Sequence, residues 1–296
     1  MKLTKITKMF MDGSFPLHLL DNMSDEKYLK LAYWCNMGKK LNLENPVTYN
    51  EKVQWLKPYN RKDIFTKMVD KVGAKEYVAE IMGKDCIIPT IGVWDSFDEI
   101  DFDSLPDKFV LKCTHDSGGL VVCKDKTKFD KEAARKKINK CLKVNYFYYS
   151  REWPYKNVKP RIIAEEYLDT IDSELVEYKI FCCDGKAKMV LVCKGTAHGA
   201  GRTNDYCDIS LNRLPFTCLY PNSKGELEKP DELPQLLDFA EKLSKDIPWL
   251  RVDTYLVNGK IYFGELTFFH NSGFVPFEPE SWDQEIGSWI TLPDIN

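Results

Sequence analysis

An arginine and two acidic residues lie in the last two strand-like segments of the chain and could bind a metal ion beside a phosphate. Arg251 and Asp253 are two residues apart in LRVDTYLV, and Glu265 lies in KIYFGELTFF. Alternate residues of a strand share a face, so Arg251 would lie beside Asp253. Magnesium commonly takes one or two carboxylates and leaves its other positions to phosphate oxygens and water. A structural ion pair on half-exposed strands explains these residues equally well.

The turn between these two segments argues against a shared metal site. Asn258-Gly259 predicts a two-residue hairpin turn. In the regular register that such a turn sets, Glu265 faces Val252 and Asp253 faces Gly264, so the two acids point to opposite faces of the ribbon. Only a bulge or a longer turn would bring both acids to one metal ion.

A glycine-containing segment between two strand-like runs, KCTHDSGG at residues 112–119, could hold phosphate groups. Gly118 and Gly119 allow the backbone to approach a ligand closely, and Lys112 supplies a positive charge. The segment is not a Walker P-loop, because it lacks the Gly-Lys-Ser/Thr ending and a strand follows it. An ordinary glycine hairpin turn is the alternative.

Two further polar segments are candidates for ligand contact. Residues 165–168 (EEYL) close one predicted strand and Lys179 lies in the next, which suits an edge that holds a nucleotide, although surface charge explains both. His198 and Arg202 lie in the loop GTAHGAGRTND, where they could contact substrate or belong to a mobile lid; a loop without chemistry is the alternative. No order of Ser, His and Asp, or of Cys and His, indicates a nucleophilic triad, which disfavours a hydrolase.

The elements that must position these residues change character along the chain. The first 85 residues show helical spacing of apolar residues, and from residue 86 onward short β-branched and aromatic runs predict strands. Asp184-Gly185 and Asn258-Gly259 predict tight hairpins, and hence antiparallel pairing. We therefore expect an α+β fold. Helices are expected at 24–40, 49–59, 63–70, 71–83, 130–147 and 230–247, and strands at 86–94, 108–113, 120–124, 161–168, 177–183, 186–195, 250–257 and 260–269.

Composition narrows the class of protein further. With 44% hydrophobic residues in 296, the chain can bury a large core, and its net charge of −3 gives no bias toward nucleic acid or anionic lipid. No apolar run reaches the length of a membrane span, and the first residues lack a signal-peptide core, so a cytoplasmic protein is expected. Ten scattered cysteines indicate buried reduced thiols rather than disulfides or a zinc site.

Taken in chain order, these segments resemble an ATP-grasp enzyme. The resemblance is closest to the branch named for teichuronopeptide biosynthesis among bacterial polysaccharide-synthesis proteins, which has segments like YNEKVQWLK, DKVGAKEYVAEIMG, IIPTIGVWD and VNGKIYFGELTF, and it runs from about residue 45 to 293. The matching motifs are Asp70-Lys71, residues 109–112 with Ser117-Gly118-Gly119, residues 163–168, residues 251–253 and residues 265–267.

The resemblance implies a role for each motif. Lys71 and Lys112 would hold the phosphates of ATP, and the loop from His115 through Ser117, Gly118 and Gly119 would close over them. Glu165, Glu166, Tyr167 and Leu168 would line the adenine and ribose pocket, with Lys179 nearby. Arg251 would stabilise the transferring phosphoryl group, and Asp253 and Glu265 would bind Mg²⁺ against the regular hairpin register.

Two positions depart from the pattern of the family. Many ATP-grasp enzymes have Glu-x-Asn on the last strand, whereas this chain has Glu265-Leu266-Thr267, with Asn271 as a substitute metal ligand. Glu76 stands where members of this branch often have an arginine, which removes one expected phosphate contact.

The fold implied is a helical N-terminal region over residues 1–85, followed by two ATP-grasp lobes over 86–296. The nucleotide lobe would span about 105–180, and the metal and substrate lobe about 181–296. The activity implied is an ATP- and Mg²⁺-dependent ligase that joins a small-molecule or saccharide carboxylate to an amine through an acyl phosphate, in surface polysaccharide or capsule biosynthesis.

Two alternatives to the ligase stay open. A nucleotide-sugar glycosyltransferase would use Asp101-Phe102-Asp103 as a metal-binding Asp-x-Asp, although an acidic surface turn explains this tripeptide as well. A nucleotide-binding scaffold would bind ATP without turnover, and the Thr267 departure keeps that alternative open. The sequence does not indicate an oligomeric state.

Overall fold

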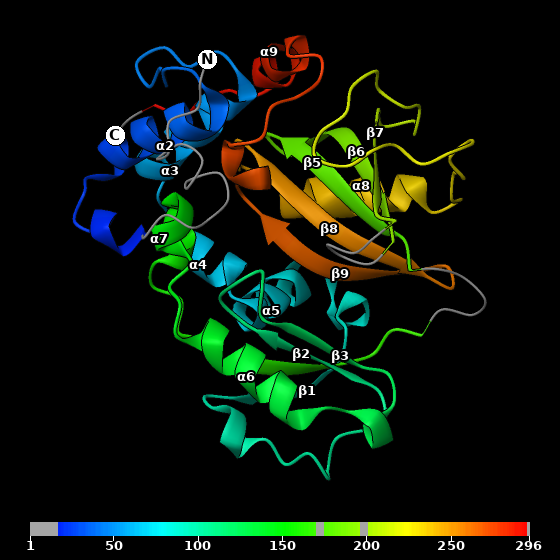
Figure 1. Cartoon of the computed structure of the whole chain (residues 1–296). Helices are drawn as coiled ribbons and strands as arrows, with labels where there is room; N and C mark the ends of the chain where they lie inside the picture. The colour runs from blue at the N-terminus through cyan, green and yellow to red at the C-terminus, as the bar shows by residue number, and fades with distance from the viewer. Residues whose placement is uncertain (1–16, 170–174, 196–200, 295–296) are drawn as a thin grey trace.

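The computed structural model of the chain describes residues 17–169, 175–195 and 201–294. Alternating apolar residues and tight hairpin turns form two antiparallel sheets in it (Figure 1). The first sheet has the strand order β1-β4-β2-β3, and the second has the order β7-β6-β5-β8-β9. With helices packed around both sheets, the expected α+β class is confirmed. The strands are β1 Thr90–Trp94, β2 Phe109–Cys113, β3 Leu120–Cys123, β4 Ile162–Glu166, β5 Glu177–Cys183, β6 Lys186–Lys194, β7 Thr203–Cys207, β8 Leu250–Val257 and β9 Lys260–Thr267.

Side-chain caps fix the starts of several helices. Thr48 and Glu51 form a capping box at the start of α3, and Asp70 accepts a hydrogen bond from the N–H of Gly73 in the first turn of α5. Asp130 does the same for α6. The helices are α2 Asp25–Met37, α3 Tyr49–Tyr59, α4 Asp63–Val69, α5 Lys71–Met82, α6 Lys131–Leu142, α7 Phe147–Ser150, α8 Leu233–Leu243 and α9 Ser281–Ser288.

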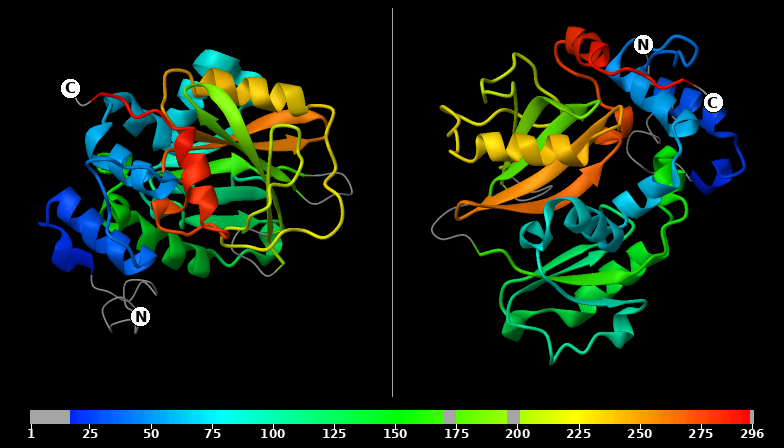
Figure 2. Two further views of the ribbon diagram at one scale, coloured as in Figure 1. Left: turned by 90° about the horizontal axis from the view of Figure 1, so that it is seen from above. Right: turned by 180° about the vertical axis from the view of Figure 1, so that it is seen from behind.

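The two sheets belong to different hydrophobic cores. α6 packs on β2 and β3 and forms a small core with the first sheet, while α8 packs on β5, β6 and β8 of the second (Figures 1 and 2). The N-terminal helices share the larger core with the second sheet rather than forming one of their own. The N-terminal region is therefore joined to the second lobe through continuous apolar contact.

The strand periodicity decides which side chains of the first sheet are free for chemistry. In β2, Phe109, Leu111 and Cys113 are buried in the core shared with α6, whereas Lys112 alternates with them and points to the opposite face. The same alternation in β4 sends Glu165 to the face of Lys112. That face is turned toward the second sheet.

Some predicted elements differ from the observed ones. The helix expected over 130–147 ends earlier, as α6, and α7 begins at its last residue; α9 lies in a C-terminal segment for which no helix was expected. Residues 203–205, expected within the loop GTAHGAGRTND, belong to β7, because residues 203–207 pair with β6 along their whole length. The sheets change over between β4 and β5, close to the predicted lobe boundary near residue 180; the division into domains stays a prediction.

All ten cysteines are free thiols, most of them buried, as predicted. Burial raises the pKa of the Cys113 and Cys182 thiols to about 12, so these two are unreactive apolar side chains rather than nucleophiles. Of the helices that the structure describes, none combines the length and the apolar run that a membrane span requires.

Candidate active site

The buried carboxylate of Glu165 lies between two lysines on the inner face of the first sheet. Nζ of Lys75 lies 2.5 Å from Oε1 of this carboxylate, and Nζ of Lys112 lies 2.5 Å from Oε2. Burial alone would raise the pKa of Glu165, but Lys112 and Lys75 together outweigh burial, so the net shift is downward. Glu165 is therefore ionised, and the three groups carry one net positive charge.

A pocket brings this cationic group together with the end of the second sheet. Residues from α4, α5 and the first sheet line one side of it, and residues of β9 line the other. Positions far apart in the sequence thus line one pocket. The charged lining residues are Lys71, Lys75, Lys112, Glu165 and Glu265.

The glycine loop after β2 is fastened to the start of α5. The Lys71 ammonium donates to the backbone carbonyl of Asp116, and the Asp116 carboxylate accepts from the N–H of Gly119 at 3.0 and 3.1 Å. A side chain at Gly119 would place its Cβ 2.5 Å from Sγ of Cys113, so the tight return of the chain requires glycine. Residues 117–118 at the tip are exposed and are available to a ligand.

His115 belongs to the same loop, but its ring is turned toward α6. Nε2 lies 3.2 Å from the carbonyl oxygen of Cys141 and 3.1 Å from that of Val144. These carbonyls lie at and just beyond the end of α6, where helix carbonyls lack partners within the helix. The imidazole of His115 therefore fastens the loop to the end of α6.

The segment after β4 leads toward the second sheet and presents an aromatic ring between two cations. Lys108 and Lys124 each place Nζ 5.9 Å from the centre of the Tyr167 ring. Glu166 is exposed and Leu168 is half-buried. This part of the predicted nucleotide edge is therefore open, unlike the ion-paired Glu165 beside it.

A β-bulge in the hairpin of β8 and β9 decides the geometry of the two acids. Asp253 pairs with Glu265, whereas the next pair is Thr254 with Phe263, which leaves Gly264 as the extra residue. The regular register, with Asp253 facing Gly264, is therefore wrong. Paired residues project to the same face, so the bulge places both carboxylates together.

A chain of ion pairs crosses this face of the second sheet. Arg251 binds the Asp253 carboxylate in bidentate fashion, with Nε–Oδ1 at 2.6 Å and Nη2–Oδ2 at 2.8 Å. The Lys179 ammonium donates to Oδ2 of Asp253. It also lies 2.7 Å from Oε1 of Glu177, so it connects the two carboxylates. Burial would raise the pKa of Asp253, but Arg251 and Lys179 outweigh it and lower the pKa, so this buried carboxylate is ionised.

Two more side chains hold the guanidinium of Arg251. Nη2 donates to Oγ1 of Thr267 at 2.9 Å, and Nη1 lies 2.5 Å from Nδ1 of His270. Burial, and after it the charges of Arg251 and Lys179, hold the pKa of His270 well below its ordinary value. Thr267, which replaces the asparagine of many family members, is therefore bound to the arginine.

Asn271 and Glu76, the two positions that depart from the family pattern, do not line the pocket. The Asn271 amide nitrogen is 3.5 Å from Sγ of Cys218 and 3.2 Å from Nε2 of His270. Glu76 is exposed and lies 3.7 Å from Lys67, whereas its neighbour Lys75 enters the pocket. Lys75, and not residue 76, thus brings a positive charge to the pocket.

The other polar segments singled out in the sequence lie apart from this pocket where the structure describes them. Arg202 lies 3.5 Å from the Glu177 carboxylate, at the edge of the second sheet. His198 lies outside the described residues. The Asp101 carboxylate accepts from the N–H of Asp103, and Phe102 between them packs in the core of the first lobe. This Asp-x-Asp turn therefore gives no support to a glycosyltransferase.

The donor set for a cation consists of two carboxylates. Within residues 17–169, 175–195 and 201–294, no group of three or more His, Cys, Asp and Glu side chains could hold a metal ion. An ionised carboxylate has about four lone-pair positions. Arg251 and Lys179 occupy three positions on Asp253, which leaves about one for a metal. With Glu265 opposite, this set matches Mg²⁺ that takes its other ligands from phosphate and water.

Sequence reasoning missed three residues of this site: Lys75, Thr267 as a partner of Arg251, and His270. Lys75 had a readable signal, because Lys71 and Lys75 are four residues apart and so share one face of a helix. His270 had none, since 19 residues separate it from Arg251.

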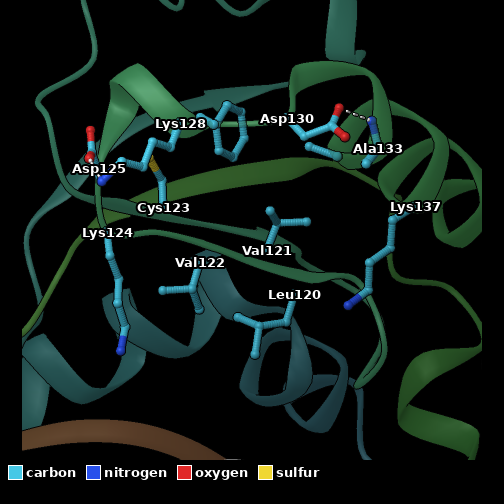
Figure 3. A pocket seen from close by; sticks show the side chains of 12 residues that line it. Leu120, Val121, Val122, Cys123, Lys124, Asp125, Lys128, Asp130, Ala133 and Lys137 are labelled. Carbon is cyan, nitrogen blue, oxygen red and sulfur yellow. Dashed lines mark hydrogen bonds and ion pairs between the residues drawn. The ribbon is translucent and has the colours of Figure 1, made fainter.

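A larger pocket lies at the outer edge of the first sheet (Figure 3). It is lined by both faces of the edge strand β3 and by the first turns of α6. Lys124 and Lys137 extend from opposite ends of it, and Asp130 caps the N–H of Ala133. None of the predicted site residues lines this pocket.

Comparisons with known proteins give one family match. The profile of the TupA-like ATP-grasp family matches residues 51–291. No curated protein sequence matches the chain.

Solved structures of ATP-grasp ligases are also similar to the chain, at low identity. The ATP-grasp ligase PsnB with its minimal precursor is 10% identical (TM-score 0.42), with 71% of this chain and 55% of that one covered. D-alanine–D-alanine ligase from Bacillus anthracis with ATP is 13% identical (TM-score 0.40), with 81% and 62% covered. The same ligase from Helicobacter pylori is 13% identical (TM-score 0.45), with 82% and 69% covered. The chain thus spans between half and about two thirds of the length of these structures.

Proposed function

Because the chain belongs to the TupA-like ATP-grasp family, we propose that it is an ADP-forming ligase that joins a carboxylate to an amine through an acyl phosphate. Membership confirms the resemblance to ATP-grasp enzymes, the ATP-grasp fold class and the expected use of ATP and Mg²⁺. The observation that carries the proposal is that Lys112 of the first sheet and Glu265 of the second line one pocket.

In this proposal the cations of the first lobe hold the triphosphate. Lys71, Lys75 and Lys112 border the pocket, and Glu165 neutralises one charge while it fixes the positions of two ammonium groups. The exposed loop tip at 117–118 covers the phosphates. Residues 166–168 contact the adenine and ribose, because they form the open edge between the sheets.

The second lobe supplies the groups that act on the transferring phosphoryl group. Asp253 and Glu265 would hold Mg²⁺, which neutralises charge on the phosphate oxygens when it is bound. A carboxylate oxygen of the substrate attacks the γ-phosphorus and ADP leaves. Arg251 stabilises the negative charge that spreads over the phosphoryl oxygens, since its guanidinium is already oriented. The amine then displaces inorganic phosphate from the acyl phosphate and releases a proton.

The partners we propose are a small-molecule or saccharide carboxylate and an amine, in surface polysaccharide or capsule biosynthesis. The basis is the polysaccharide association of the resembled branch. We place the reaction in the cytoplasm, where ATP is made.

The test is incubation of the purified chain with Mg·ATP and a pool of uronic acids, amino acids and amino sugars. We expect ADP, phosphate and a new amide by mass spectrometry. A carboxylate labelled with ¹⁸O would transfer one label to the released phosphate, which only an acyl phosphate predicts. Sugar-donor consumption without ADP would favour a glycosyltransferase, and ATP binding without turnover would favour a scaffold.

Two variants connect the activity to the pocket. Lys112→Met and Glu265→Gln each remove one charge from opposite lobes, so we expect both to abolish ADP formation while the protein still folds. Lys186→Met is the matched control, because Lys186 is exposed and pairs with Glu241 on the outer side of the second sheet. Unchanged ADP formation in both pocket variants would contradict the proposed site.

A further inference from the structure

Four of the five N–H groups of the Arg251 guanidinium have an acceptor within the protein. A guanidinium has five N–H groups. Two donate to Asp253, one to Thr267 and one, from Nη1, to Nδ1 of His270. One N–H of Nη1 is left for a ligand, and its direction is fixed by the other four contacts.

The contact with Arg251 defines the protonation state of His270. Arginine only donates, so Nδ1 of His270 must carry the lone pair, and in the neutral ring the proton is then on Nε2. Nε2 lies 3.0 Å from the hydroxyl oxygen of Tyr206, which can accept that proton's hydrogen bond, and 3.2 Å from the side-chain amide of Asn271, whose oxygen end would then face the ring. His270 thus connects Arg251 of β8 to Tyr206 of β7 through a neutral imidazole.

The segment that carries His270 has a backbone conformation that would not persist alone. Asn271 and Ser272 have φ values of 51° and 52°, and Gly273 has φ of 63°. Non-glycine residues in this region are strained and persist only where the surroundings fix them. The surroundings here must therefore hold the segment.

Buried polar side chains of α3 supply that support. Nε2 of Gln54 donates to the carbonyls of Ser272 and Gly273 at 2.9 and 2.7 Å, and Nζ of Lys57 donates to the Ser272 carbonyl at 2.9 Å. The hydroxyl of Ser272 donates to the buried carboxylate of Glu152 at 2.6 Å. Gln54 and Lys57 are fully buried, so these contacts exclude water.

We infer that His270 is a positioning residue for Arg251, held in place by α3, so that the N-terminal helices form part of the catalytic apparatus. This inference rests on the proposed function, in which Arg251 stabilises the transferring phosphoryl group. His270 does not touch the reacting atoms; it fixes the guanidinium plane through Nη1 and leaves the second N–H of that nitrogen for a ligand.

The kinetic test compares three substitutions of His270. Asparagine places an oxygen near the position of Nδ1, glutamine places its amide near that of Nε2, and leucine provides neither. We expect His270→Leu and His270→Gln to lower kcat by about 10- to 100-fold with KM for ATP nearly unchanged, because a contact with a charged donor is lost. His270→Asn should recover most of that loss, and His18→Asn at an exposed position should have no effect.

A measurement without substrate keeps this inference separate from the proposed reaction. The chain has four histidines, so ¹⁵N-histidine spectra at pH 7 can assign the tautomer of His270. We expect the Nε2–H form in the native protein and a different tautomer population in Arg251→Met. An Nδ1–H form in the native protein, or a kcat for His270→Leu within twofold of the native value, would overturn the inference. An inactive protein with the expected tautomer would instead count against the ligase.

Discussion

Replacing Thr267 by valine removes one hydrogen bond from Arg251 without changing the volume of the side chain. The bond joins Nη2 of Arg251 to Oγ1 of Thr267 at 2.9 Å, and Arg251 is only 8% exposed. A hydrogen bond to a charged group contributes about 1.5–3 kcal/mol. Three other contacts still hold the guanidinium in the variant, so we expect the lower end of this range, which is about a tenfold loss of kcat.

The assay is ADP formation at saturating ATP, measured beside thermal unfolding. Thr267→Ser keeps the hydroxyl and should restore kcat. Thr254→Val is the matched control, because the hydroxyl of Thr254 donates to the Tyr178 carbonyl on the opposite face of β8 and its loss should lower stability only. Equal kcat in the native protein and Thr267→Val, or equal losses in the two valine variants, would refute the role of Thr267.

Two further predictions concern stability. Glu165→Gln leaves the ammonium groups of Lys75 and Lys112 without their shared carboxylate, so we expect a loss of about 3–5 kcal/mol in urea unfolding, and no loss would contradict the buried ion triad. Burial lowers the pKa of Lys57 to about 7, against a partial opposing effect of Glu152. Unfolded Lys57 keeps its proton up to its ordinary pKa near 10.5, whereas folded Lys57 loses its proton above about pH 7. Between these pH values the unfolded state binds one more proton than the native state. The free energy of unfolding should therefore rise with pH, by at most about 1.4 kcal/mol per pH unit. Lys57→Met should remove this slope in urea unfolding measured at several pH values, and an unchanged slope would assign it to other groups.

Local chemistry predicted most of the elements but not the shape of the critical hairpin. The Asn258-Gly259 turn was correctly predicted, and both residues have positive φ. The bulge at Gly264 has no comparable signal, because a glycine within a strand is compatible with a regular ladder or with a bulge. Counting from the turn therefore gave the wrong partner for Glu265, and only the family resemblance pointed to the observed one.

The candidate site was predictable where residues are close in sequence or belong to a recognisable motif. Lys112, Asp253 and Glu265 belong to such motifs, and the structure brings them to the cleft or its border. Gln54 and His270 do not: Gln54 of α3 contacts Ser272, 218 residues away, and His270 reaches Arg251 from beyond the end of β9. Tertiary packing of this kind is decided by the whole core and leaves no local pattern.

The central claim is that one triphosphate site is formed between the two sheets, and the most direct measurement is a crystal structure with Mg²⁺ and a non-hydrolysable ATP analogue. The account predicts the triphosphate between Lys112 and Glu265, with Mg²⁺ on the carboxylates of Asp253 and Glu265. A nucleotide bound elsewhere, with neither Lys112 nor Glu265 in contact with it, would contradict the account.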